Sequence, residues 1–280
     1  MTVLVLELKI VADQFKLYLV ATMPHFILIV KEVENTLNPP ISNSHVDNSL
    51  FQANMYRMSV AVMFRDVSYS NVLRDFSSEI EEGERVLIVT AREEESTALT
   101  RLLTGFLMPE QGSIVISGNS TAEATPEQLM QTRIRMGIIP FQGGLVSNLK
   151  MWENIFLPYY YHTGKPKPED DELALNYLKK LNCSEKHLAF PAHLSLYEKR
   201  VAAFTRAAIM QPDIMIYCNT LERISELDQA SLASVLDDFH TEKTGRTSIY
   251  LASTTELPLQ SNFSSVIYIH PQQKNSGATT

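Results

Sequence analysis

The sequence contains few cysteines and no excess of basic residues. Its two cysteines, Cys183 and Cys218, stand far apart in 280 residues and match no metal-binding or redox spacing. Such cysteine usage is typical of a reduced, cytosolic compartment. The chain carries 24 Lys and Arg against 32 Asp and Glu, a net charge of −8. This balance, with no basic stripe, argues against a nucleic-acid partner and favours simple solubility.

No stretch reaches the roughly 18 apolar residues that suggest a membrane-spanning helix. The nearest candidate, residues 17–30, is short and is interrupted by Pro24 and His25. It is also a poor signal peptide, because Glu7 and Asp13 stand where a basic start belongs and no small-residue cleavage site follows. We therefore expect a chain that is soluble or peripheral to a membrane.

The first 60 residues differ from the rest of the chain. Residues 35–49 are rich in Asn, Pro and Ser, which is typical of a linker. Three methionines follow closely: Met55, Met58 and Met63. Two interpretations are open for residues 1–60: an unfolded segment before a later natural start, or a small amphipathic appendage that touches a membrane or a partner. Residues 271–280 are expected to be a disordered tail.

From residue 63 onward, short apolar runs alternate with helical patterns. Runs such as residues 85–90 (RVLIVT) and 213–218 (DIMIYC) are typical of buried strands. The other expected strands span residues 113–117, 135–140, 247–253 and 265–270. Helices are expected over residues 96–105, 173–181 and 200–210. Strands that alternate with helices predict an α/β fold with a mostly parallel sheet.

The order of three pieces suggests a family. Gly83-Glu84-Arg85 precedes a strand, STALTRLLTG (96–105) follows it, and Pro109-Glu110-Gln111-Gly112-Ser113 comes next. This order resembles the opening of an ABC transporter ATP-binding subunit. The resemblance covers residues 63–270 and implies a P-loop NTPase-like ABC ATPase fold, with a mostly parallel sheet and an antiparallel edge. It also implies a nucleotide-binding-like domain over residues 61–270, with an inserted helical subdomain at about residues 143–195.

The phosphate-binding loop of that family, GxxxxGK[ST], aligns with residues that lack its chemistry. They are Thr90, Ala91, Arg92, Glu93, Glu94, Glu95, Ser96 and Thr97. Ser96 replaces the lysine, and Thr97 keeps the hydroxyl that would hold Mg²⁺. Missing glycines obstruct a backbone wrap around phosphates, and each glutamate about 6 Å from a phosphate charge repels it by roughly 3 kcal/mol at a dielectric of 20. Alternatively, Glu93–Glu95 form only the acidic first turn of a helix.

Phe141-Gln142 resembles the Q-loop region of the family, because RIRMG precedes it and ENIFLP follows it. In the family, this Gln contacts Mg²⁺ and the attacking water, and the segment beyond it contacts the membrane subunit. Gln142 is retained. Farther along, Trp152 and Tyr159–Tyr161 are expected to pack within the helical subdomain or, alternatively, to contact a permease.

Leu194, Ser195, Leu196, Tyr197 and Glu198 stand where the family has its signature, LSGGQ. The signature presents a serine hydroxyl and glycine N–H groups to the ATP of the opposite subunit. Here leucine and tyrosine replace both glycines and block that close approach. Ser195 survives, and an alternative interpretation makes it only a helix N-cap.

The run DIMIYC occupies the place of the Walker B strand, where an Asp should bind Mg²⁺ and a catalytic Glu should follow. Cys218 and Asn219 stand there instead. A neutral thiol is a poor ligand for Mg²⁺, and an amide takes up no proton near neutral pH. Thr254 replaces the switch His of the H-loop. We therefore expect no catalytic residue and no bound metal; Asp228 and Tyr69 are left without a role.

Three hypotheses follow from these losses. The leading one is a pseudo-ATPase: a structural or regulatory subunit of a membrane transporter that needs no cofactor. The second is an active transport ATPase that binds ATP and Mg²⁺ through Thr97, Gln142 and Ser195. The third is a soluble interaction protein on the same fold.

The same resemblance implies partners, a cargo and a location. RIRMGIIPFQGG and ENIFLP are most similar to the ATPases of Mla-type phospholipid transport systems, which suggests lipid transport. The implied partners are a membrane permease subunit and another ABC ATPase subunit, in a homodimer or heterodimer, with no nucleic acid. The implied location is cytoplasmic, peripheral to the inner membrane.

Overall fold

The computed structural model describes residues 4–7, 16–22, 25–31, 59–162, 164–259 and 262–269. The chain divides into two compact units, residues 1–54 and 55–280. The first contains a three-stranded antiparallel sheet: β1 (Leu4–Glu7), β2 (Lys16–Thr22) and β3 (His25–Lys31). The expected linker at 35–49 and tail at 271–280 lie outside the described residues, so the interpretations of residues 1–60 stay predictions.

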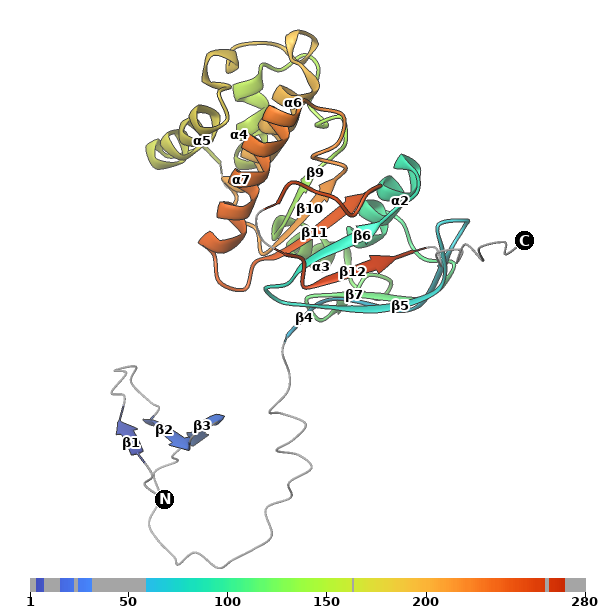
Figure 1. Cartoon of the computed structure of the whole chain (residues 1–280), viewed down its shortest axis with the longest axis vertical. Coiled ribbons are helices and arrows are strands. Elements are labelled where there is room, and N and C mark those ends of the chain that lie inside the picture. The colour runs from blue at the N-terminus through green and yellow to red at the C-terminus, as the bar shows by residue number, and fades with distance from the viewer. Residues whose placement is uncertain are drawn as a thin grey trace, which may run out of the picture. The chain divides into compact units, whose positions relative to one another are not determined.

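The second unit is built on a five-stranded sheet in the order β12-β6-β11-β10-β9 (Figure 1). Its strands are β6 (Arg85–Val89), β9 (Met136–Ile139), β10 (Ile214–Cys218), β11 (Thr247–Ala252) and β12 (Ser265–Tyr268). All neighbouring strands of this sheet pair in parallel. The strands of a parallel sheet are buried on both faces, so nearly all of their residues are apolar. The short apolar runs of this sequence fit that requirement. The predicted α/β fold with a parallel sheet is confirmed.

Antiparallel strands form a separate four-stranded sheet in the order β5-β4-β7-β8. They are β4 (Val60–Tyr69), β5 (Leu73–Glu81), β7 (Gln111–Ile116) and β8 (Asn119–Ser120). Val62, Phe64 and Ile114 of this sheet share one buried core with Val86 and Ile88 of the parallel sheet. The antiparallel strands therefore make a second layer that packs on the parallel sheet.

Helices complete the two faces of the parallel sheet. They are α2 (Glu93–Leu103), α3 (Pro126–Ile134), α4 (Met151–His162), α5 (Pro168–Lys180), α6 (Leu196–Ala208) and α7 (Glu226–Glu242). Alternate residues of a strand face opposite layers: Tyr217 belongs to the core beneath α4–α7, whereas Ile216 and Cys218 belong to the core that includes α2. Figure 1 shows α4–α7 gathered on one side of the sheet and β4, β5 and β7 on the other.

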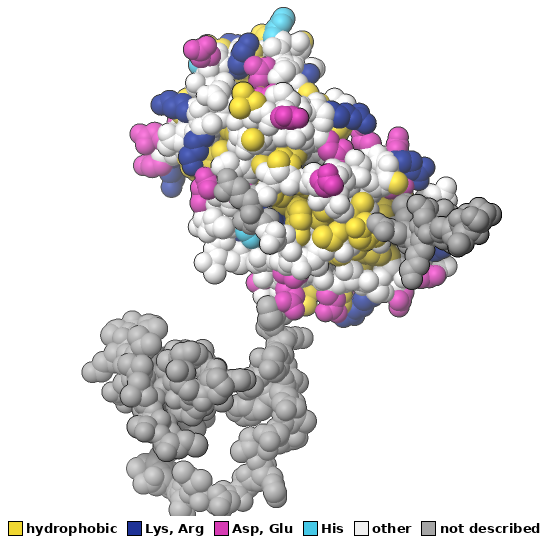
Figure 2. Space-filling view, viewed as in Figure 1, with side chains coloured by type: hydrophobic (Ala, Val, Ile, Leu, Met, Phe, Trp, Pro, Cys, Tyr) yellow, Lys and Arg dark blue, Asp and Glu magenta, His cyan; other side chains and the backbone are white. Residues whose placement is uncertain are grey.

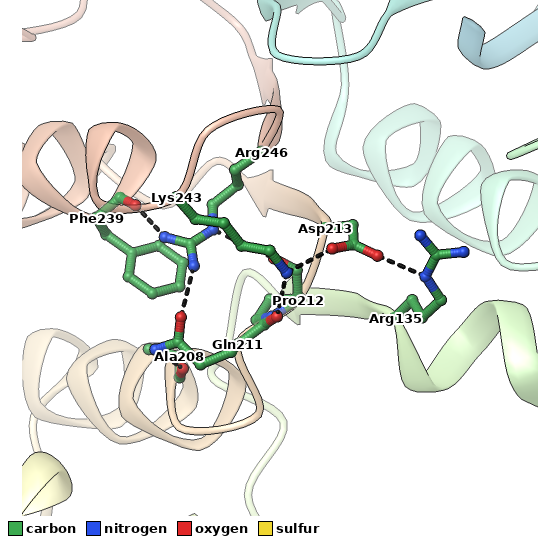
Figure 3. Close-up of polar contacts among 8 residues, drawn as sticks. All are labelled: Arg135, Ala208, Gln211, Pro212, Asp213, Phe239, Lys243 and Arg246. Carbon is green, nitrogen blue, oxygen red and sulfur yellow. Dashed lines mark hydrogen bonds and ion pairs between the residues drawn. The ribbon is translucent and has the colours of Figure 1, made fainter. Parts of the chain in front are cut away.

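A polar network ties the amino ends of β9 and β10 to the segment before β11 (Figure 3). Asp213 accepts hydrogen bonds from Arg135 and Lys243. Burial alone would raise the pKa of Asp213, but the bonds from these two cations hold it below its ordinary value. Arg246, which is buried, donates from Nε to the backbone oxygen of Pro212 at 3.2 Å. These contacts fix the sheet at the end opposite to the carboxyl ends of its strands.

Among the described residues, the strand β12 forms an edge of the parallel sheet and pairs with β6. Figure 2 shows apolar side chains gathered over this part of the surface. Val266 and Tyr268 of β12 are 43% and 41% exposed, as is common for an edge strand. Within the described part of the chain, no helix has both the length and the apolar character needed to cross a bilayer.

His240 on α7 makes the stability of the fold depend on pH. Its Nδ1 lies 2.9 Å from the Ser248 hydroxyl. Burial, followed by the charges of Arg85 and Arg246, lowers the pKa of His240 to about 4. The folded chain therefore keeps a neutral imidazole that the unfolded chain protonates at about pH 6.5. We predict that the free energy of unfolding falls as the pH drops from about 6.5 to about 4.

Urea denaturation across this pH range measures the effect. His240→Gln cannot take up the proton, so its unfolding free energy should fall less steeply over the same window. His193→Gln removes an exposed imidazole and should leave the profile of the wild type unchanged. A His240→Gln profile as steep as that of the wild type would contradict the assignment.

Candidate functional site

The connection between β6 and α2 is short because the helix begins early. α2 begins at Glu93, three residues before the predicted start at Ser96. Glu93–Glu95, which align with the phosphate-binding loop, therefore lie in the first helical turn. Acidic residues are favourable there, since the amino end of a helix carries partial positive charge. Only residues 90–92 of this connection remain outside regular structure.

Glu95 turns back toward this connection. Its carboxylate accepts hydrogen bonds from the backbone N–H of Ala91 at 2.8 Å and of Arg92 at 3.3 Å. The guanidinium of Arg92 donates to the same carboxylate from Nε at 2.9 Å. The Glu95 side chain is 1% exposed, whereas that of Arg92 is 58% exposed. The glutamate is thus a buried, hydrogen-bonded part of the loop.

The two hydroxyls that align with the end of the phosphate loop lie on different faces of α2. Ser96 is buried, and its Oγ lies 2.9 Å from Thr90 Oγ1. Thr97 is exposed. The hydroxyl that contacts Cys218 belongs to Thr100, at 3.0 Å from Sγ. Residues four apart share a helix face, so Ser96 and Thr100 face the sheet and the structure does not bring Thr97 to Cys218.

Thr97 instead lines a groove of about 350 Å³ beside α2. The groove is lined by Tyr69, Glu93, Glu94, Thr97, Ala98, Arg101 and Leu107. Tyr69, which the sequence left without a role, ends β4 and reaches this groove. Two carboxylates against one guanidinium give the groove an acidic character, which disfavours a polyphosphate.

Cys218 and Asn219 lie at the carboxyl end of β10 without a negative charge between them. Burial raises the pKa of the Cys218 thiol to about 11, so it is neutral at pH 7. Asn219 adopts a positive φ of 47° and donates from Nδ2 to a carboxylate oxygen of Glu222 at 3.0 Å. Within the described residues, no group of three or more His, Cys, Asp or Glu side chains is placed to hold a metal ion.

Glu222 is a site residue that sequence reasoning missed. Besides the bond from Asn219, its Oε1 accepts one from the backbone N–H of Ser253 at 2.6 Å. A carboxylate thus joins the carboxyl ends of β10 and β11, where α/β proteins commonly bind ligands. The sequence could have pointed to Glu222 only through the expected pairing of β10 with β11, which brings the residues after the two strands together. Thr254 acts locally, since its hydroxyl accepts from the Glu256 N–H at 3.1 Å.

The segment aligned with the signature begins α6. Ser195 caps this helix: its Oγ accepts from the Glu198 N–H at 3.2 Å, and a Glu198 carboxylate oxygen accepts from the Ser195 N–H at 2.7 Å. This reciprocal capping box is the arrangement expected under the alternative interpretation, in which Ser195 is a helix N-cap. Tyr197 donates to the backbone oxygen of Leu181 at 3.0 Å, and burial raises its pKa. The side chain at the second glycine position, Tyr197, is thus anchored to the chain itself.

The Q-loop segment is held by a buried arginine. Gln142 itself is exposed just after β9. The Arg200 side chain is fully buried and donates to the backbone oxygens of Phe141 and Thr220, each at 3.0 Å. Burial lowers its pKa to about 10, so it stays charged at pH 7. The Phe141 ring lies 4.9 Å from the guanidinium of Arg200 and 5.0 Å from that of Arg223.

Removing this guanidinium should destabilise the fold. Arg200→Met leaves buried carbonyl groups without donors, which should cost roughly 2–4 kcal/mol of unfolding free energy. Arg200→Lys keeps one donor group and should lose less. Lys199→Met changes the neighbouring, half-buried cation and serves as the control. Urea denaturation measures all three; equal stability of Arg200→Met and Lys199→Met would refute the anchoring role.

Known proteins share this architecture. Residues 73–219, which are 147 of the 280, match the ABC transporter family. The chain belongs to that family. It is 28% identical over 176 residues to the methionine import ATP-binding protein MetN of Vibrio vulnificus, a match that covers 63% of this chain and 50% of MetN.

Two further likenesses bear on the subfamily and the fold. The intermembrane phospholipid transport system ATP-binding protein MlaF of Haemophilus influenzae is 30% identical over 121 residues, 43% of this chain and 46% of MlaF. The chain spans about half the length of MetN and MlaF. The dimeric structure of MJ0796, a bacterial ABC transporter cassette, has a TM-score of 0.62 at 20% identity and covers 69% of this chain and 88% of that one. The predicted ABC ATPase fold is confirmed.

Proposed function

We propose that this chain is a pseudo-ATPase: the cassette subunit of a membrane transporter, with a structural or regulatory role. The carboxyl end of β10 carries the proposal. There a neutral Cys218 thiol is paired with Thr100, where Mg²⁺ would need an oxygen ligand. Asn219 cannot act as a general base beside it. These two changes remove both metal binding and water activation.

The opposite side of the site also disfavours a nucleotide. Ser96 stands where the family has its lysine, and its hydroxyl is buried against that of Thr90. The cation of Arg92 is paired with Glu95, and the groove beside α2 is acidic. In an ABC dimer each site combines the phosphate loop of one subunit with the signature of the other. A homodimer of this chain would therefore hold two deficient sites.

Calorimetric titration of the full chain with Mg-ATP tests the proposal. We predict no micromolar binding and no ATP hydrolysis, because no cation or metal ligand remains to hold the phosphates. Thr97→Ala is the matched variant, since Thr97 lines the groove and is exposed. Micromolar affinity in the wild type that is lost in Thr97→Ala would overturn the pseudo-ATPase assignment.

Glu222 favours a second candidate, an active ATPase with atypical residues. Its carboxylate bridges the ends of β10 and β11, close to the place of the missing catalytic Glu. Under this alternative the wild type hydrolyses Mg-ATP and Glu222→Gln does not. Glu226→Gln, an exposed position at the start of α7, is the control and should keep the activity of the wild type.

A groove of about 530 Å³ supports a permease subunit as the partner. It is lined by Thr104, Phe106, Pro126, Met130, Arg133, Met136, Ile138, Tyr161 and His162. Phe106 and Tyr161 are 66% and 79% exposed. An exposed apolar surface of this kind is typical of a protein–protein contact site. The guanidinium of Arg133 lies 4.1 Å from the Phe106 ring. An amphipathic helix with an acidic residue fits this surface, and such a partner would keep the chain at the cytoplasmic membrane face.

Variants in this groove should release the chain from membranes. Phe106→Asp and Met130→Asp place charges on the apolar wall and should lower recovery of a permease subunit about tenfold. Leu188→Asp, a position that is 59% exposed outside the groove, is the control. Recovery is measured by mass spectrometry after affinity purification from detergent-solubilised membranes.

The same purification of the wild-type chain distinguishes a transporter subunit from a soluble interaction protein. A wild-type chain that brings down no integral membrane subunit would instead favour a soluble interaction protein. Undiminished recovery in both groove variants would contradict the docking site.

The most specific part of the proposal is that the transported substrate is a lipid. It rests on the similarity of RIRMGIIPFQGG and ENIFLP to Mla-type ATPases and on the likeness to MlaF. Relatives named for amino-acid transport, such as BztD of Rhodobacter capsulatus, match as well. Phospholipid bound to the purified transporter complex would support the lipid assignment, and a complex free of phospholipid would count against it. A homodimer or a heterodimer with a second cassette subunit is proposed with it.

A further inference from the structure

Three buried polar atoms without a hydrogen-bond partner gather at the carboxyl end of β10. Among the described residues, they are Nη2 of Arg200, Oδ1 of Asn219 and Oγ1 of Thr220. None of these residues is more than 4% exposed. Buried polar atoms are almost always hydrogen-bonded, because an unpaired one costs free energy. A group of three such atoms therefore points to a small polar ligand.

Backbone contacts hold the three atoms in one place. Arg200 donates from Nη1 to the backbone oxygen of Thr220 at 3.0 Å, and Nη2 is bonded to the same guanidinium carbon. Nη1 also donates to the backbone oxygen of Glu222. The N–H of Glu222 in turn donates to the backbone oxygen of Asn219 at 3.2 Å. The guanidinium thus lies on the turn that carries both Asn219 and Thr220.

The hydrogen-bonding roles of these atoms select the ligand. A guanidinium nitrogen only donates, whereas a hydroxyl donates and accepts. Nδ2 of Asn219 donates to the Glu222 carboxylate at 3.0 Å, so Oδ1 is left as an acceptor. The ligand must therefore accept from Arg200 and donate to Asn219. A halide ion cannot donate and a metal ion cannot accept, but a water molecule does both.

We propose that one internal water molecule binds between Arg200, Asn219 and Thr220. A buried water typically makes about three hydrogen bonds to polar groups that the protein leaves unpaired. The water deepens the proposed function, on which its role rests, because Asn219 stands in the place of the catalytic Glu of the family. Both ends of the Asn219 amide are then engaged inside the protein, Nδ2 by Glu222 and Oδ1 by the water. The water links α6 to the end of β10.

Variants of Thr220 test the water directly. Thr220→Val keeps the shape of the side chain and removes the hydroxyl, whereas Thr220→Ser keeps the hydroxyl. Oxygen-17 relaxation dispersion of the solvent counts internal waters, because they stay bound far longer than surface waters. We expect Thr220→Val to lose one internal water and Thr220→Ser to keep the count of the wild type. Thr205→Val is the control, since the buried Thr205 hydroxyl already donates to the backbone oxygen of Val201 at 2.9 Å.

Urea denaturation gives a second readout. A buried hydroxyl that bonds to nothing costs free energy, so its replacement by a methyl group would leave the unfolding midpoint unchanged or raise it. A hydroxyl bonded to the water stabilises the fold, and the midpoint of Thr220→Val should then lie below that of the wild type. An unchanged or raised midpoint, or an unchanged count of internal waters in folded Thr220→Val, would overturn the proposal.

If Thr220→Val does not fold, nuclear magnetic resonance of the wild type decides. Cross-relaxation between a long-lived water and the side-chain N–H groups of Arg200, separated from proton exchange by its sign, supports the site. Absence of this cross-relaxation excludes it. The proposed function fails by a different result, Mg-ATP binding to the wild type, so the two outcomes are distinguishable.

Discussion

The buried guanidinium of Arg200 is the interaction on which the arrangement of the site depends. It extends from α6 and donates to backbone oxygens after β9 and after β10, at Phe141 and Thr220. A buried charge costs free energy unless it is hydrogen-bonded; Nε and Nη1 of Arg200 make such bonds, whereas its Nη2 has no partner in the described part of the chain. The three segments therefore cannot separate without leaving the cation and its acceptors unpaired. Because the acceptors are backbone atoms, this frame is independent of the side chains that would contact a nucleotide.

Several side chains lie within this frame at positions that bind nucleotide in the family. Here they form hydrogen bonds with neighbouring residues of the same chain. Thr100 pairs with Cys218, Asn219 with Glu222, and Ser195 with Glu198. A catalytic site works in the opposite way, because its donors and acceptors are held ready for a ligand or a transition state. These internal bonds support the proposed pseudo-ATPase, in which the fold is kept and the ATP chemistry is lost.

The surface beside α3 and α4 carries the exposed aromatic residues that could meet a partner. The aromatic residues of α4 divide between two tasks. Trp152 packs on Phe156 at a centroid distance of 4.8 Å, and Tyr159 donates to Asp170 at 2.7 Å, whereas Tyr161 is exposed at the groove. Packing and partner contact were alternatives for this cluster: Trp152 and Tyr159 pack against the chain, and the exposed Tyr161 is the residue left for the proposed partner contact.

The sequence by itself determined the order of strands and helices, because short apolar runs between helical patterns fit a parallel sheet covered on both faces. It also predicted which groups of the family's nucleotide site are replaced, because motifs align by residue order and need no coordinates. Tertiary structure alone decided which groups meet. The early start of α2 at Glu93, the contact of Thr100 with Cys218 and the bridge from Glu222 to Ser253 depend on helix phase and strand adjacency. Both are set by packing between segments far apart in the chain, which no local pattern records.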